Sequence, residues 1–263
     1  MNRLLDIFTP CQPVPSRSQQ LIWLAWALSG LVLWQFWPSD VLPRPSEVAQ
    51  AFGHLWMTEG LGQQLAISYT VQLEALGIAM IGSLLLAYSA TIPVMRPLVE
   101  FISTWRFISL GPLVIFFSLM ITSEGHALKV WLLVFAIAVF YVTSMIPVVL
   151  DVPTEELDHA RTLRMNPWQV TREVIVFGRL DVAMEMLRQN AAMGWMMLTM
   201  VEGLVRSEGG IGTLLLNQLK HFRLAEVAAI IIVLFAVGFV QDILIQTHRH
   251  FLFPYADLEK ERR

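Results

Sequence analysis

The sequence has few charged residues and only one cysteine. Charged residues make up 15% of the 263 residues, whereas an average soluble domain has about 25%. Cys11 is the single cysteine, which excludes an intrachain disulfide, and no Cys/His spacing typical of a metal site occurs. The formal net charge of -3 is close to neutral, and we expect no nucleic-acid partner.

Motifs for nucleotide binding and for hydrolytic catalysis are also missing. No GxxxxGK[ST] sequence occurs, so this chain does not bind ATP through a P-loop. No Ser/His/Asp set and no pair of carboxylates marks an active site. We therefore expect a chain that is not an enzyme and holds no cofactor of its own. Energy for any transport must then come from a partner or from an ion gradient.

Long apolar runs are abundant instead. Hydrophobic residues make up 56% of the chain, and a bilayer core needs about 20 consecutive apolar residues. The runs predict an all-α, polytopic membrane protein with about six transmembrane helices. They cover residues 18–39, 75–95, 107–123, 130–150, 189–205 and 227–241, the last extending to about 246 if Asp242 faces protein or water. Gly111-Pro112 predicts a break within the third run.

Positive charge is distributed unevenly between the segments that join these runs. With the N-terminus inside, the inside segments hold thirteen Lys and Arg residues and the outside segments hold five. This bias predicts that both termini and residues 151–180 lie in the cytoplasm. We accordingly expect a cytoplasmic tail over 1–17, a single transmembrane domain over 18–250, and a second cytoplasmic tail over 251–263.

Residues 151–180 are the most informative stretch, because they carry a dense set of charges between two apolar runs. Thr154 predicts the N-cap of a short helix, and Asn166 followed by Pro167 predicts the start of a second one. Three apolar residues of the first helix fall on one face: Leu157, Ala160 and Leu163. The stretch therefore predicts a short helix, a tight corner and a second helix in water.

This stretch resembles a cytoplasmic segment shared by the membrane subunits of bacterial ATP-binding-cassette (ABC) importers, E-A-A-x-x-x-G followed by I-x-L-P. The corresponding runs are Asp158 to Arg164 and Ile175 to Phe177. Further features follow in the order expected of the nitrate, sulfonate and taurine branch of that family. These are Leu42 to Phe52, Lys129, Leu187-Arg188, Trp195, Glu202 and Gly209 to Gly212. The resemblance covers roughly residues 20–255.

The sequence departs from the family pattern at four positions. These are His159 for the first motif alanine, Arg164 for the glycine, Phe177 for the motif proline and Asp181 for a second proline. If the glycine position requires a left-handed backbone, arginine there costs roughly 1 kcal/mol or more. Asn166 tolerates that conformation better and is the alternative place for the corner. The departures suggest a specialised ATPase partner.

The resemblance implies that the first helix is a coupling helix, which docks on a cytoplasmic ATPase subunit that binds ATP and Mg. The coupling residues are then expected to be Glu155, Glu156, Leu157, Asp158, Ala160, Arg161, Leu163 and Arg164. It also implies a permease in the bacterial inner membrane, with a second permease subunit (homodimer or close heterodimer) and an extracytoplasmic solute-binding protein. The implied solute is a small polar or anionic compound of the nitrate, bicarbonate, sulfonate or taurine class.

Glu202 is the one acidic residue well inside a predicted span, and such carboxylates are functional candidates by default. We take Glu202, Met197 and Trp195 as candidates for lining a solute pathway. Two alternatives stay open for Glu202. It is a structural partner of Arg206, one turn away, or of a polar group on a neighbouring helix, or it is the ion site of a secondary transporter or channel. The latter class predicts a paired inverted repeat, which we do not find in the sequence.

Overall fold

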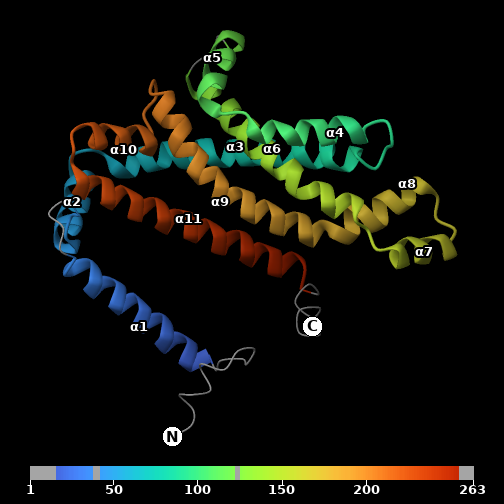
Figure 1. The fold of residues 1–263 in the computed structure, drawn as a ribbon, viewed down its shortest axis with the longest axis horizontal. Coiled ribbons are helices and arrows are strands. Elements are labelled where there is room, and N and C mark those ends of the chain that lie inside the picture. Colours follow the sequence, from blue (N-terminus) through green and yellow to red (C-terminus); the bar gives the residue numbers. More distant parts are fainter. Residues whose placement is uncertain (1–15, 38–41, 122–124, 255–263) are drawn as a thin grey trace, which may run out of the picture.

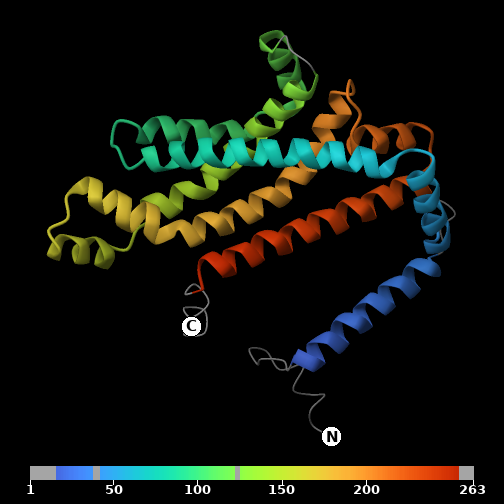
Figure 2. The same cartoon turned by 180° about the vertical axis from the view of Figure 1, so that it is seen from behind.

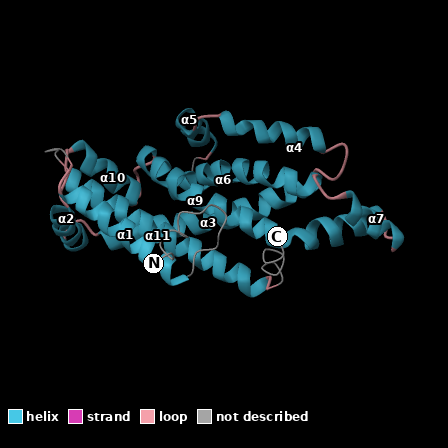
Figure 3. Cartoon of the chain, turned by 60° about the horizontal axis from the view of Figure 1, so that its bottom comes forward, coloured by secondary structure: helices cyan, strands magenta, loops and turns pink. Residues whose placement is uncertain are grey.

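The computed structural model describes residues 16–37, 42–121 and 125–254, and every regular element among them is a helix (Figure 3). The elements are, in order, α1 (Ser16–Gln35), α2 (Pro45–Met57), α3 (Leu61–Ser89), α4 (Arg96–Ser103), η2 (Thr104–Phe107), α5 (Leu110–Met120), α6 (Gly125–Leu150), α7 (Thr154–Thr162), α8 (Pro167–Val170), η3 (Thr171–Val176), η4 (Phe177–Arg179), α9 (Leu180–Leu204), α10 (Ile211–Lys220) and α11 (Leu224–Leu252). The all-α prediction is confirmed. Most of the two predicted tails, including Cys11, lies outside the described residues.

Three of the described helices are long and apolar enough to cross a membrane, namely α3, α6 and α11. The number rises to four if α4 with η2 and α5, which are bent by 114°, form one broken span. α1 and α9, expected as the first and fifth spans, do not pass this test of length and composition. Glutamines near the ends of α1 and four charged residues in α9 lower their hydropathy. The polytopic class is confirmed, and the count of six stays a prediction.

The break in the third predicted span lies before Gly111-Pro112. Ile108 and Ser109 are extended, with ψ angles of 126° and 137°, so η2 ends and α5 begins at Leu110. Pro112 then occupies the first turn of α5, where a helix does not need its backbone N–H. The prediction of a break at Gly111-Pro112 is therefore wrong in position, because this proline fits the start of a helix.

The core lies between α3, α6 and α9, with α11 packed alongside α9 (Figures 1 and 2). Its largest cluster includes Val71 from α3, Leu133 from α6 and Leu198 from α9, all fully buried. The hydroxyl of Tyr141 donates a hydrogen bond to the backbone oxygen of Ala183 at 3.0 Å and so joins α6 to α9. Small buried residues of α3 let the helices approach closely. They are Ala75, Ala79, Ser83 and Ala87.

The long helices run along the longest dimension of the molecule, so its two ends carry different elements (Figure 1). α7 and α8 lie at one end, beyond α6 and α9, whereas α2 and α10 lie at the other. α7 and α8, from a segment predicted to lie inside the cell, thus lie at the end opposite α2 and α10, from segments predicted to lie outside.

Candidate functional site

The corner between α7 and α8 is the first candidate site. α7 begins at Thr154 with Pro153 as its N-cap, so the predicted capping role of Thr154 is wrong by one residue. α8 begins at Pro167, as predicted. The side chain of Asn166 accepts a hydrogen bond from the Gln169 N–H at 2.8 Å, and the Gln169 side chain accepts one from the Asn166 N–H at 2.9 Å. This reciprocal capping fixes the start of the second helix.

Arg164 stands at the family's glycine position, and its φ is 55°. The backbone is therefore left-handed there, a conformation that costs a residue with a Cβ roughly 1–2 kcal/mol. Asn166 is extended instead, with φ -75° and ψ 161°. The corner turns at Arg164, and the alternative that placed it at Asn166 is wrong, because Asn166 is occupied as an N-cap.

Arg164→Gly is expected to leave stability unchanged or to raise it slightly. Glycine removes a clash of roughly 1–2 kcal/mol but adds roughly 0.5–1 kcal/mol of lost backbone freedom. Arg161→Gly is the matched control, because it removes an exposed arginine from a helical position and should destabilise by about 1 kcal/mol. Thermal unfolding of the purified variants measures both, and a less stable Arg164→Gly protein would contradict the left-handed assignment.

The predicted coupling residues separate into buried and exposed ones. Ala160 is buried and Leu157 is half-buried, on the side where α7 packs against η3. Leu163 is 57% exposed. The charged members are all exposed: Glu155, Glu156, Asp158, Arg161 and Arg164. Of the predicted apolar docking face, Ala160 is therefore buried within this chain, Leu157 is partly exposed and Leu163 is largely exposed, and the docking role of this face stays a prediction.

Trp168 is an exposed residue that the sequence reasoning did not include in the coupling set. It lies in the first turn of α8 and is 71% exposed. A large aromatic residue in a stretch predicted to lie in water was the signal that could have identified it. We define the corner surface as Leu163, Arg164 and Trp168.

Two ion pairs involve α7. Arg161 donates to Asp158 at 2.7 Å within the helix, and such exposed pairs contribute little to stability. Arg179 donates to both oxygens of Glu156 at 3.2 Å, and the Arg179 side chain is only 19% exposed. The second pair therefore joins α7 to η4, immediately before α9.

Glu202 forms the second candidate site, at the opposite end of α9, where it is fully buried. Its Oε1 accepts a hydrogen bond from the Ser68 hydroxyl at 2.6 Å, and its Oε2 accepts one from the Gly212 N–H at 2.8 Å. Arg206 instead donates to the backbone oxygen of Gly203 at 3.1 Å. Of the two structural partners predicted for Glu202, Arg206 is thus wrong, and a polar group on a neighbouring helix is found in the Ser68 hydroxyl of α3.

Side chains from α3 and α9 cap the N-terminus of α10. The Gly210 N–H donates to Gln64 Oε1 at 2.6 Å, and the Ile211 N–H donates to the Ser68 hydroxyl at 2.8 Å. The first N–H groups of a helix have no partner within it, and negative charge is favourable beside them. Together with Glu202 these side chains satisfy them. We term Gln64, Ser68 and Glu202 the α10 cap.

Lys129 is a fully buried cation beside this cap. Its Nζ donates to the backbone oxygen of Gly209 at 2.6 Å, and Glu202 and Glu208 supply negative charge nearby. A buried cation needs a compensating charge and hydrogen-bond partners. Both oxygens of Glu202 are engaged, so the geometry favours a structural role for Glu202 over the pathway and ion-site hypotheses.

Glu202→Gln is expected to destabilise the chain by about 1–3 kcal/mol, the cost of an unsatisfied buried group. The amide nitrogen cannot accept from either donor, the Ser68 hydroxyl or the Gly212 N–H, and Lys129 loses one of the two negative charges near it. Thermal unfolding and solute uptake should be measured together. A pathway role would instead change uptake in a variant of unchanged stability, and that result would contradict the capping role.

The other two pathway candidates have different surroundings. Trp195 is buried, and its Nε1 donates to Gln241 Oε1 at 2.8 Å, which joins α9 to α11. Trp195 also borders a groove of about 440 Å³, together with Met196 and Phe235. Met197 is partly buried against the hydrophobic core. Of the three candidates, Trp195 is therefore the one placed beside this open groove.

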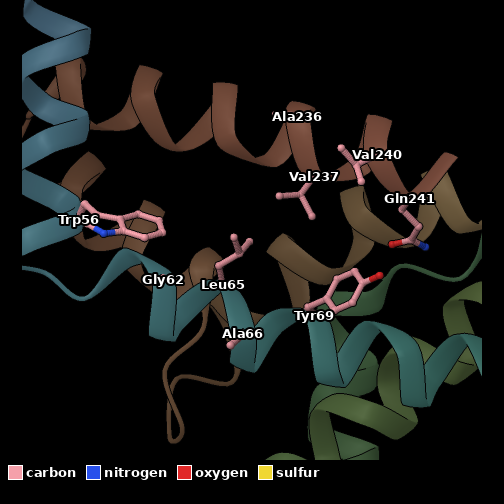
Figure 4. A pocket seen from close by; sticks show the side chains of 9 residues that line it. All are labelled: Trp56, Gly62, Leu65, Ala66, Tyr69, Ala236, Val237, Val240 and Gln241. Carbon is pink, nitrogen blue, oxygen red and sulfur yellow. The ribbon is translucent and has the colours of Figure 1, made fainter. Parts of the chain in front are cut away.

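A second groove, also of about 440 Å³, lies between α2, α3 and α11 (Figure 4). Trp56 and Val237 belong to its mainly apolar lining, and Tyr69 and Gln241 are its polar members. Figure 4 shows the Tyr69 hydroxyl turned toward Gln241. The Tyr69 ring stacks on Trp195 with centroids 6.1 Å apart. Trp195 and Gln241 thus connect the linings of the two grooves.

Comparison with known proteins identifies a related fold. No protein-family model matches the chain, and no curated protein matches it. Among solved structures, a chain of the MetNI methionine ABC transporter in an inward-facing conformation is similar, with a TM-score of 0.53 and 16% identity. The match covers 75% of this chain and 97% of that chain. The fold is that of an ABC transporter chain. At this identity the likeness shows the fold alone.

Proposed function

We propose that this chain is the transmembrane permease subunit of an ABC importer in a bacterial inner membrane. The observation that carries the proposal is the corner at Arg164, whose φ of 55° is the left-handed backbone that a glycine adopts readily. The residue differs from the family motif, but the helix, corner and helix are retained at one end of the molecule (Figure 1). The MetNI-like fold supports the same proposal.

In this proposal the corner surface docks on a cytoplasmic ATPase subunit that binds ATP and Mg. Leu163 and Trp168 supply apolar contact, and Arg164 supplies charge beside them. The exposed charges of α7 form a rim that sets orientation more than affinity. Hydrolysis on the partner would then move the corner, and with it the helices that enter the bilayer. A second permease subunit would complete the solute pathway.

The proposed solute is a small polar or anionic compound of the nitrate, bicarbonate, sulfonate or taurine class. This rests on the ordered features shared with that branch of importers, among them Lys129, Trp195 and Glu202. An extracytoplasmic solute-binding protein would deliver the solute at the end that carries α2 and α10. The α10 cap supports this role, because it would hold that end in a fixed shape during docking.

Solute uptake into membrane vesicles of the host tests the proposal. Vesicles with and without the chain are loaded with ATP and the solute-binding protein is added outside, across a panel of nitrate, bicarbonate, taurine and alkanesulfonates. We expect chain-dependent uptake that requires ATP and persists when ionophores collapse the ion gradients. Chain-dependent uptake that needs a gradient and no ATP would contradict the proposal and favour an ion-coupled transporter.

A further inference from the structure

Charged side chains of opposite sign face each other between α9 and α11. On α9, Asp181, Glu185 and Arg188 are spaced three or four residues apart and share one face of the helix. On α11, Asp242 and Arg249 are seven residues apart and also share a face. Arg249 pairs with Asp181 and Glu185 of α9, and Asp242 pairs with Arg188. We term these five residues the charge ladder.

The contacts within the charge ladder are short and shared. Arg188 donates to Glu185 at 2.7 Å and to the two oxygens of Asp242 at 2.7 and 2.8 Å. Arg249 donates to Glu185 at 3.0 Å and to the backbone oxygen of Asp181 at 3.2 Å. Glu185 therefore bridges both arginines. The side chains are only 15–31% exposed, so water screens these charge-assisted bonds less than it screens surface pairs.

The charge ladder lies next to the corner. Arg179, which pairs with Glu156 of α7, precedes Asp181 by two residues. η3 and η4 continue directly into α9. A path of helix and ion pairs thus leads from α7 through Arg179 and the start of α9 to α11, and Figures 1 and 2 both show α11 alongside α9.

We propose that the charge ladder makes α7, the start of α9 and α11 move as one rigid body, so that movement imposed at the corner reaches the last helix. Arg188 and Arg249 are positioning residues in this role. The inference rests on the proposed function, because an ATPase partner imposes the movement. Arg96 provides a contrast, since its ion pair with Glu100 lies within α4 and joins no two elements.

Distances between two spin labels test the proposal in the assembled complex. Thr154→Cys on α7 and Leu252→Cys on α11 place labels at exposed positions outside the predicted coupling residues, in a Cys11→Ser background. Labelled subunits are diluted with unlabelled ones, so that only distances within one subunit are measured. We expect one narrow distance in the otherwise unchanged chain, the same with and without ATP.

Arg249→Met should broaden that distance and make it change on addition of ATP. The amount of solute taken up per ATP hydrolysed should fall about fivefold or more. Fivefold is the lower end of the effect that one site typically has on another. Arg249→Lys keeps the positive charge and should restore both readouts, whereas Arg96→Met should change neither. A variant that only lowered stability would reduce the yield of the complex without changing the ratio of uptake to hydrolysis.

Two results would overturn the rigid-body role. One is a distance in the parent chain that changes on addition of ATP, and the other is a narrow, unchanged distance in Arg249→Met. If the proposed function is wrong, the result is different, because no ATPase subunit would purify together with the chain. A narrow distance that broadens in Arg249→Met would still support the charge ladder as the rigid link between α9 and α11.

Discussion

Gly210→Ala is expected to destabilise the folded chain strongly. The φ of Gly210 is 107°, a backbone conformation that residues with a Cβ rarely adopt. A Cβ at this position would also collide with the carboxylate of Glu202. That carboxylate cannot move away without breaking its hydrogen bonds to Ser68 and Gly212.

The expected loss is a large part of the free energy of unfolding of the chain. Backbone strain of about 1–3 kcal/mol and overpacking of about 1–3 kcal/mol together cost about 2–6 kcal/mol, against the 5–15 kcal/mol that separates folded from unfolded proteins. Gly77→Ala in α3 is the matched control, because nothing lies within 4 Å of the added Cβ. Alanine there should be neutral or stabilising by up to about 1 kcal/mol.

Size-exclusion chromatography and thermal unfolding in detergent measure this difference. Gly210→Ala should give little monodisperse protein and Gly77→Ala should give as much as the unchanged chain. A Gly210→Ala protein that unfolds at the unchanged temperature would show that Glu202 and the start of α10 are not arranged as described.

Trp168→Ala is expected to weaken docking of the ATPase subunit about 30-fold or more while the chain stays folded. The Trp168 side chain is 71% exposed, so its loss removes little packing within the chain. An aromatic anchor in the centre of an interface typically contributes 2 kcal/mol or more, which corresponds to binding that is about 30-fold weaker. Leu163→Ala should have a smaller effect, because leucine is less often such an anchor.

Trp23→Ala is the matched control for Trp168→Ala. Trp23 lies on α1, away from the corner, and is 70% exposed, so the two variants lose the same side chain at equal exposure. Equilibrium binding of the purified ATPase subunit to each variant in lipid nanodiscs should show unchanged affinity for Trp23→Ala. Equal affinity of Trp168→Ala and Trp23→Ala would exclude the corner surface as the docking site.

Local sequence signals were sufficient to predict a short helix, a corner and a second helix within residues 151–180. Asn166 followed by Pro167 predicted the start of α8, because a cap and a proline at the first helical position act within four residues. The turn itself was harder to place. Asn166 was the residue better suited to a left-handed backbone, yet Arg164 adopts it, since the capping of α8 holds Asn166 in the extended region.

Contacts between distant elements were not predictable from the sequence. Ser68 and Glu202 are 134 residues apart in the sequence. No local pattern around either residue indicates that the two together cap the N-terminus of α10. The stripe of Leu157, Ala160 and Leu163 was predicted from helical spacing, but spacing does not say what a stripe packs against. In the structure η3 contacts α7, and Ala160 is buried.

Co-purification with an ATPase subunit is the most direct test of the central claim, which is that this chain couples to such a subunit through the corner surface. The tagged chain is purified from host membranes in mild detergent, and its partners are identified by mass spectrometry. The proposed function predicts a partner that carries GxxxxGK[ST], present at one copy per permease chain and retained by Trp23→Ala but lost from Trp168→Ala. A folded chain that purifies without any such partner, or that retains it equally in both variants, would contradict this claim.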